Sequence, residues 1–149
     1  MCFSPALIFR LAIGLVVLVI GAKPQDHAIR NRGTLNIPQT HCWRLSSGKV
    51  SREPLGTCDV WYEAVNPSVR FLVPLRGVTW AIAGGKTLGY MGCLRSKLSG
   101  EKINFRDLPK GTMVCALAEG LYSEFSIDDL LPAEYGTITL RISYTTWER

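Results

Sequence analysis

The stretch TITLRISY, residues 137–144, decides the fold class of this chain. Its apolar and polar residues alternate without a break, which places four apolar side chains on one face of an extended chain. Strict alternation of this kind predicts a strand with one face on a core and one face in water. Thr137–Thr145 is therefore the best-defined strand of the sequence.

The rest of the chain has short apolar segments, and Pro or Gly recurs every few residues. This punctuation breaks helices and favours hairpins. The best helical candidate is Ile127–Glu134, which Pro132 limits to a turn or two. The sequence predicts an antiparallel β-sandwich over residues 34–149, with a small β-barrel as the alternative. The further predicted strands are His41–Leu45, Cys58–Val65, Val69–Val73, Gly77–Ala83, Thr87–Leu94, Lys102–Phe105, Thr112–Ala118 and Ser123–Ile127.

The N-terminal 22 residues have the order of a secretory signal peptide. Arg10 precedes the uncharged, mostly apolar run Leu11–Ala22, and the sequence then turns polar at Lys23. A positive start, a short apolar stretch and a small-residue end are typical of a cleaved leader. The run is short for a membrane span, although an uncleaved anchor remains the alternative. We expect residues 23–33 to form a flexible polar arm.

The cysteine count agrees with export from the cytosol. Cys2 lies in the leader, and four cysteines remain, an even number that favours two disulfides in an exported chain. We predict the pairs Cys42–Cys58 and Cys93–Cys115, because each pair is near in sequence, while the nested pairing stays open. The spacings fit no zinc site, and we predict neither a metal nor a cofactor.

The sequence contains no catalytic motif, so we do not expect an enzyme. Catalysis by carboxylates would need two neighbouring acids among Asp59, Glu63, Glu119 and Glu124. We expect each of these acids to be a solvated surface charge. A small secreted hydrolase that uses carboxylates or His41 is therefore an alternative only.

Charge and aromatic residues supply the candidate binding residues. Residues 23–110 carry 14 Lys and Arg against 6 Asp and Glu, so a basic lobe could meet acidic glycans, nucleic acid or anionic lipid. Aromatic side chains next to basic residues could stack on bases, and this weakly supports a nucleic-acid partner. The candidates are Trp43, Arg44, Trp61, Arg70 and Trp147.

These observations favour a secreted, disulfide-stabilised binding protein. Its partner would be an extracellular or host macromolecule, either a protein or a glycan. The protein would act as an effector, an inhibitor or an adhesion-type module. We expect no membrane contact once the leader is removed. A membrane-anchored surface protein is the remaining alternative.

Overall fold

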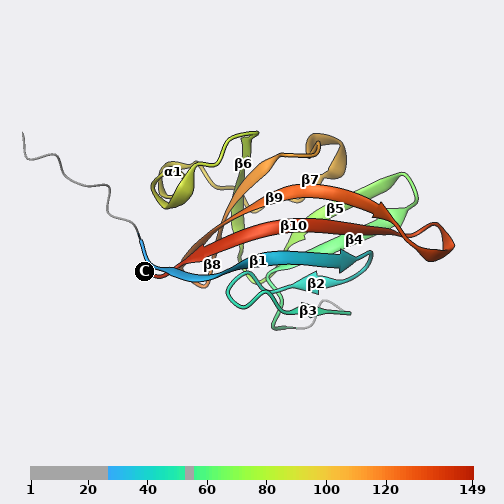
Figure 1. The fold of residues 1–149 in the computed structure, drawn as a ribbon, viewed down its shortest axis with the longest axis horizontal. Coiled ribbons are helices and arrows are strands. Elements are labelled where there is room, and N and C mark those ends of the chain that lie inside the picture. The colour runs from blue at the N-terminus through green and yellow to red at the C-terminus, as the bar shows by residue number, and fades with distance from the viewer. Residues whose placement is uncertain (1–26, 53–55) are drawn as a thin grey trace, which may run out of the picture.

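The computed structural model describes residues 27–52 and 56–149, and these residues form two antiparallel sheets that face each other (Figure 1). The sheets do not close on each other, so the predicted β-sandwich is confirmed and the barrel is not formed. The predicted leader, residues 1–22, lies outside the described residues. Within the described ranges, no helix is both long enough and apolar enough to cross a bilayer.

The first sheet has the strand order β1-β10-β9-β8-β6, and the second has the order β3-β2-β4-β5-β7. The first comprises β1 (Ile29–Pro38), β6 (Thr79–Gly84), β8 (Met113–Ala118), β9 (Leu121–Pro132) and β10 (Ile138–Trp147). The second comprises β2 (Cys42–Trp43), β3 (Val50–Ser51), β4 (Val60–Asn66), β5 (Val69–Pro74) and β7 (Ile103–Asn104). Short 3-10 turns cover Phe105–Asp107 and Glu134–Gly136.

The core lies between the sheets and confirms the alternation that defined β10. Leu140 and Ile142 are fully buried, whereas their neighbour Arg141 donates to the Asn36 side chain on the outer face. Trp43 of the second sheet meets Phe125 of the first edge to face, with 5.9 Å between ring centroids. Large apolar side chains from both sheets therefore interdigitate, which is the main source of stability in a sandwich.

Both predicted disulfides are present. Cys42 of β2 pairs with Cys58, which lies just before β4, with 5.9 Å between Cα atoms. Cys93 pairs with Cys115 of β8, with 5.2 Å between Cα atoms. The second bridge lies on the outer face of the first sheet, because Cys115 pairs with Ala81 while the neighbouring Ala116 points into the core.

The predicted strand Thr87–Leu94 is wrong, since α1 (Gly89–Arg95) occupies it. Two distant contacts hold the helix there. The Cys93–Cys115 bridge ties it to β8, and the buried Glu124 of β9 accepts hydrogen bonds from the main-chain N–H groups of Leu88 and Gly89 at 2.6 and 3.3 Å. Neither contact is local in sequence, so the local pattern of residues 87–94 could not indicate the helix.

Two further expectations fail at the ends of long strands. The helical candidate Ile127–Glu134 continues β9 as far as Pro132, because it pairs with β10 through Leu130–Leu140 and Pro132–Ile138. The predicted polar arm overlaps β1, because residues 29–33 pair with the end of β10. In both cases a partner strand supplies the backbone hydrogen bonds that composition alone does not reveal.

Candidate functional site

Two of the predicted binding residues are buried. Trp43 is fully buried in the core. Trp147 is 8% exposed and packs in an aromatic cluster, with its ring centroid 6.0 Å from that of Tyr90. Tyr90 in turn meets Tyr122 edge to face at 5.6 Å. These tryptophans stabilise the sandwich and the attachment of α1, and neither presents a contact surface.

Trp61 and Arg70, two of the candidate binding residues, lie on opposite faces of the second sheet. Trp61 pairs with Val73, whereas Arg70 pairs with Ala64, three residues further along β4. Arg70 faces the side that carries buried Tyr62. Burial raises the pKa of the Tyr62 hydroxyl to about 12, and the Arg70 charge acts weakly in the opposite direction. The structure therefore does not bring the five predicted residues together.

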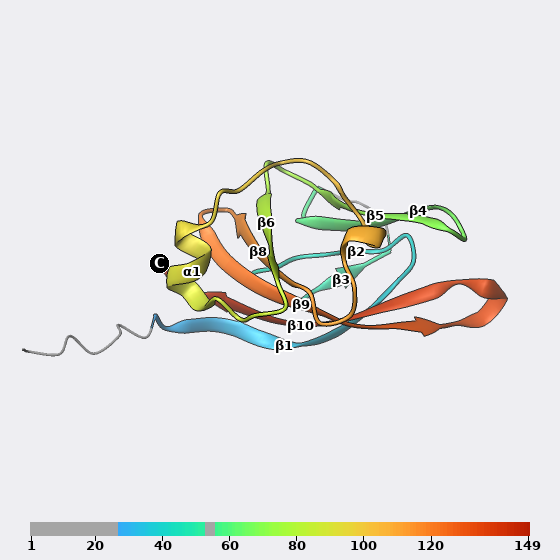
Figure 2. The same cartoon turned by 90° about the horizontal axis from the view of Figure 1, so that it is seen from above.

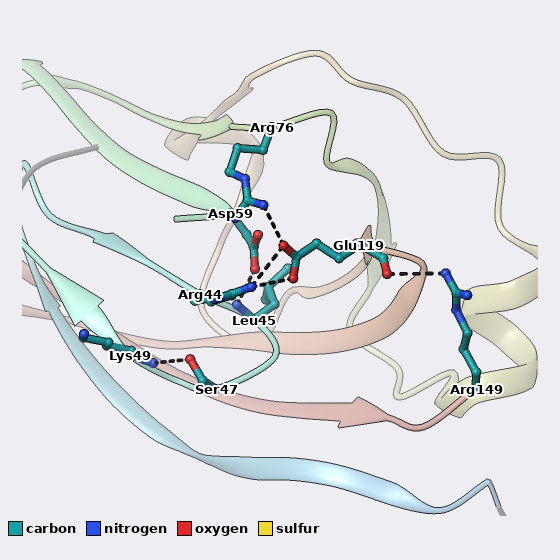
Figure 3. Close-up of polar contacts among 8 residues, drawn as sticks. All are labelled: Arg44, Leu45, Ser47, Lys49, Asp59, Arg76, Glu119 and Arg149. Atoms are coloured by element: carbon teal, nitrogen blue, oxygen red, sulfur yellow. Dashed lines mark hydrogen bonds and ion pairs between the residues drawn. The ribbon is translucent and has the colours of Figure 1, made fainter. Parts of the chain in front are cut away.

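Arg44 belongs to a polar cluster that joins the two sheets at their turns (Figure 3). Its guanidinium contacts both carboxylate oxygens of Glu119 at 2.8 and 3.0 Å, and Arg76 contacts the same carboxylate at 2.6 Å. Hydrogen bonding from Arg44 and then from Arg76 lowers the pKa of Glu119. Arg149 donates from Nε to the Gly120 carbonyl at 3.0 Å, so the C-terminus is tied to the same turn. We call Arg44, Arg76 and Glu119 the clasp.

The acids that we expected to be solvated include two buried ones. Asp59 is 1% exposed, and its Oδ2 accepts the Leu45 N–H at 2.8 Å. Its Oδ1 accepts no hydrogen bond from any residue that the structure describes, and burial raises the pKa of the carboxyl. Glu124 is 4% exposed because it caps α1. Asp59 and Glu124 thus have structural roles, and the expectation of solvated acids is wrong for both.

The remaining candidates for the hydrolase alternative, Glu63 and His41, each contact a different group. Glu63 lies 3.8 Å from the Lys102 ammonium, and His41 Nδ1 lies 3.1 Å from the Gln39 carbonyl oxygen. Among the described residues, the one group with the spacing of metal ligands is Cys93, Cys115 and Glu124. Both sulfurs there form the disulfide and Glu124 caps the helix, so these residues do not fit a metal ion.

A comparison of three Xaa-Gly turns reveals a residue that the sequence analysis missed. Arg76–Gly77, Glu119–Gly120 and Tyr135–Gly136 all have positive φ at both residues, as in the type I′ turns that join antiparallel strands. The first of these two positions favours Asn, Asp or Gly. Arg76 and Glu119 bind each other across the clasp. Tyr135 has φ 56° and is 99% exposed.

Tyr135 lies at the tip of the β9–β10 hairpin, which extends past the sandwich at the end opposite α1 (Figure 2). The β4–β5 hairpin projects at the same end in both views, and Val65 next to its turn is 61% exposed. Leu130, on β9, is 39% exposed. We call Val65, Leu130 and Tyr135 the hairpin end.

Both turns of the hairpin end are held by hydrogen bonds. The Asn66 side chain accepts the N–H groups of Ser68 and Val69, each at 2.9 Å. The β9–β10 turn closes through Thr137 N–H to the Glu134 carbonyl at 3.2 Å. Exposed apolar side chains on rigid turns lose little conformational freedom on binding, which favours recognition. The sequence signal for this site was the Tyr-Gly pair between two long strands.

Comparisons with protein families, with curated proteins and with solved structures found no match. The hairpin end is therefore the candidate site on the geometry of the described residues.

Proposed function

We propose that this chain is a secreted, disulfide-stabilised binding protein that recognises an extracellular protein through the hairpin end. Tyr135 is the observation that carries the proposal. A tyrosine at φ 56° is unfavourable, and its 99% exposure means that its side chain makes no packing contact within the described fold that would compensate for it. Strained residues of this kind concentrate at functional sites.

The chemistry of the hairpin end favours a protein partner. Tyrosine combines a large, rigid apolar ring with a hydrogen-bonding hydroxyl, and it is enriched among the residues that dominate binding energy. Val65, next to the β4–β5 turn, and Leu130, near the end of β9, add exposed aliphatic area. A glycan would be held mainly by stacking on an aromatic ring and by several polar groups, and these three side chains offer one ring and no charge.

A photo-crosslinking experiment tests where the partner binds. The photoreactive residue p-benzoylphenylalanine replaces Tyr135 in one protein and Met91 in a control. Met91 is an exposed apolar residue on α1, at the opposite end. We expect position 135 to crosslink to a discrete protein in extracellular fluid, whereas position 91 does not. Equal crosslinking from both positions, or a glycan as the sole ligand, would contradict the proposal.

Export is tested separately by the intact mass of protein recovered from a secreting host. We expect a chain that starts near Lys23 and gains about 4 Da on reduction, as two disulfides require. Full-length protein held in the membrane fraction would favour the anchored alternative instead. Turnover of glycan, RNA or peptide substrates that is lost in Glu63→Gln or His41→Ala would favour the hydrolase.

A further inference from the structure

The helix α1 exposes apolar side chains away from the sandwich. Leu88, Met91 and Leu94 are 40%, 44% and 43% exposed. Their spacing of three residues places them along one side of a helical turn. The opposite side of α1 is attached to the first sheet by buried Cys93 and by Tyr90, which packs against Trp147. The stripe is therefore an outward face on a firmly held helix.

Basic residues flank this stripe in the sequence. Lys86 precedes the helix, Arg95 is its last residue and Lys97 follows it, and residues 85–100 contain no Asp or Glu, although Lys97 also lines a pocket with Glu101 and Asp107. In the part of the chain that the structure describes, none of the three forms an ion pair. Together with the stripe they form the α1 face: Lys86, Leu88, Met91, Leu94, Arg95 and Lys97.

The N-terminal end of the described chain lies against the same helix. His27 stacks on Tyr90 with 3.5 Å between ring centroids. Only four residues, 23–26, separate His27 from Ala22, where the apolar run Leu11–Ala22 ends. The first residues of the described chain therefore lie at the α1 side of the molecule, and the hairpin end lies at the opposite side (Figure 2).

We propose that the α1 face docks on the surface of an anionic lipid bilayer. Flexible aliphatic side chains enter the boundary between headgroups and acyl chains, while the basic residues contact lipid phosphates. Protein interfaces are enriched in aromatic residues at their centre, whereas the exposed apolar residues of the α1 face, Leu88, Met91 and Leu94, are not aromatic. This contact departs from our expectation of no membrane partner after leader removal, and it is independent of the hairpin end.

Vesicle flotation tests this proposal with the chain that starts at Lys23, which retains every described residue. The vesicles contain phosphatidylcholine alone or phosphatidylcholine with phosphatidylglycerol at about 3:1. We expect flotation with the anionic vesicles in 50 mM NaCl and its loss in 500 mM NaCl, because salt screens charges near the surface. Phosphatidylcholine vesicles alone should leave the protein unbound.

Variants separate the apolar and the charged contributions. The double variant Met91→Gln, Leu94→Gln should lose flotation, and each Lys→Gln change at residue 86 or 97 should weaken binding about fivefold. The control Lys49→Gln removes an exposed charge elsewhere, and Tyr135→Asn changes the opposite end, so both should float as the wild type does. Absence of wild-type binding to anionic vesicles, or flotation unaffected by the Gln double variant, would overturn the proposal.

Discussion

Replacing Tyr135 by Asn should make the protein more stable, although it removes a large aromatic side chain. The left-handed conformation costs an ordinary residue about 1–2 kcal/mol, and Asn adopts it more readily. Tyr135 has φ 56° and is 99% exposed, so the change removes strain without removing packing. We expect a gain of about 1 kcal/mol, which raises Tm by about 4 °C in a domain of this size.

The matched variant is Glu119→Asn, which makes the same change at the same turn position. Glu119 has φ 51°, so Asn relieves similar strain there. Here the side chain holds Arg44 and Arg76, and its loss leaves two guanidinium groups facing each other without their shared carboxylate. We therefore expect Glu119→Asn to lower Tm below the wild-type value.

Thermal unfolding followed by circular dichroism, in buffer that keeps the disulfides oxidised, measures both variants. A lower Tm for Tyr135→Asn would refute the argument that Tyr135 is strained and unsupported. An equal rise in Tm for the two variants would show that the clasp contributes nothing to stability.

Four further sets of variants test the roles of buried and paired groups. Arginine contacts lower the Glu119 pKa, so this group stabilises the fold at neutral pH and its contribution is lost as the pH falls through its folded-state pKa. Burial raises the Asp59 pKa, so stability falls as the pH rises between its ordinary and folded values. Urea midpoints from pH 3 to 8 should show the first trend abolished in Glu119→Gln and the second in Asp59→Asn. Replacing Cys93 and Cys115 by Ala opens a loop with a sequence separation of 22 and should cost about 3 kcal/mol by urea unfolding; an unchanged midpoint would contradict this. Trp147→Ala should cost about 3 kcal/mol because the ring is 8% exposed, and a stable variant that lost only binding would restore Trp147 as a contact residue.

The sequence predicted correctly the parts of the fold that are determined by residues near one another in the chain. The alternation at 137–145 predicted β10, and the short separations of the cysteines predicted both disulfides. The helix α1 was missed because its cap, Glu124, comes from another strand. The strand β1 was missed entirely, because its partner is β10 at the other end of the sequence.

The candidate site was harder to predict because residue type does not reveal exposure. Trp43 and Trp147 were chosen as large aromatic residues, yet both are buried between elements distant in sequence. Tyr135 is the most exposed large apolar residue of the described chain. The Tyr135–Gly136 pair is the sequence signal for the site, but it points to Tyr135 only once the positive φ at both residues is known.

The most direct test of the account is the affinity of the crosslinked partner for the wild-type protein and for Tyr135→Asn. We predict that the variant is at least as stable as the wild type and binds at least about 30-fold more weakly, as expected for a residue that dominates an interface. Equal affinity in a stably folded variant would contradict the claim that the hairpin end is the binding site.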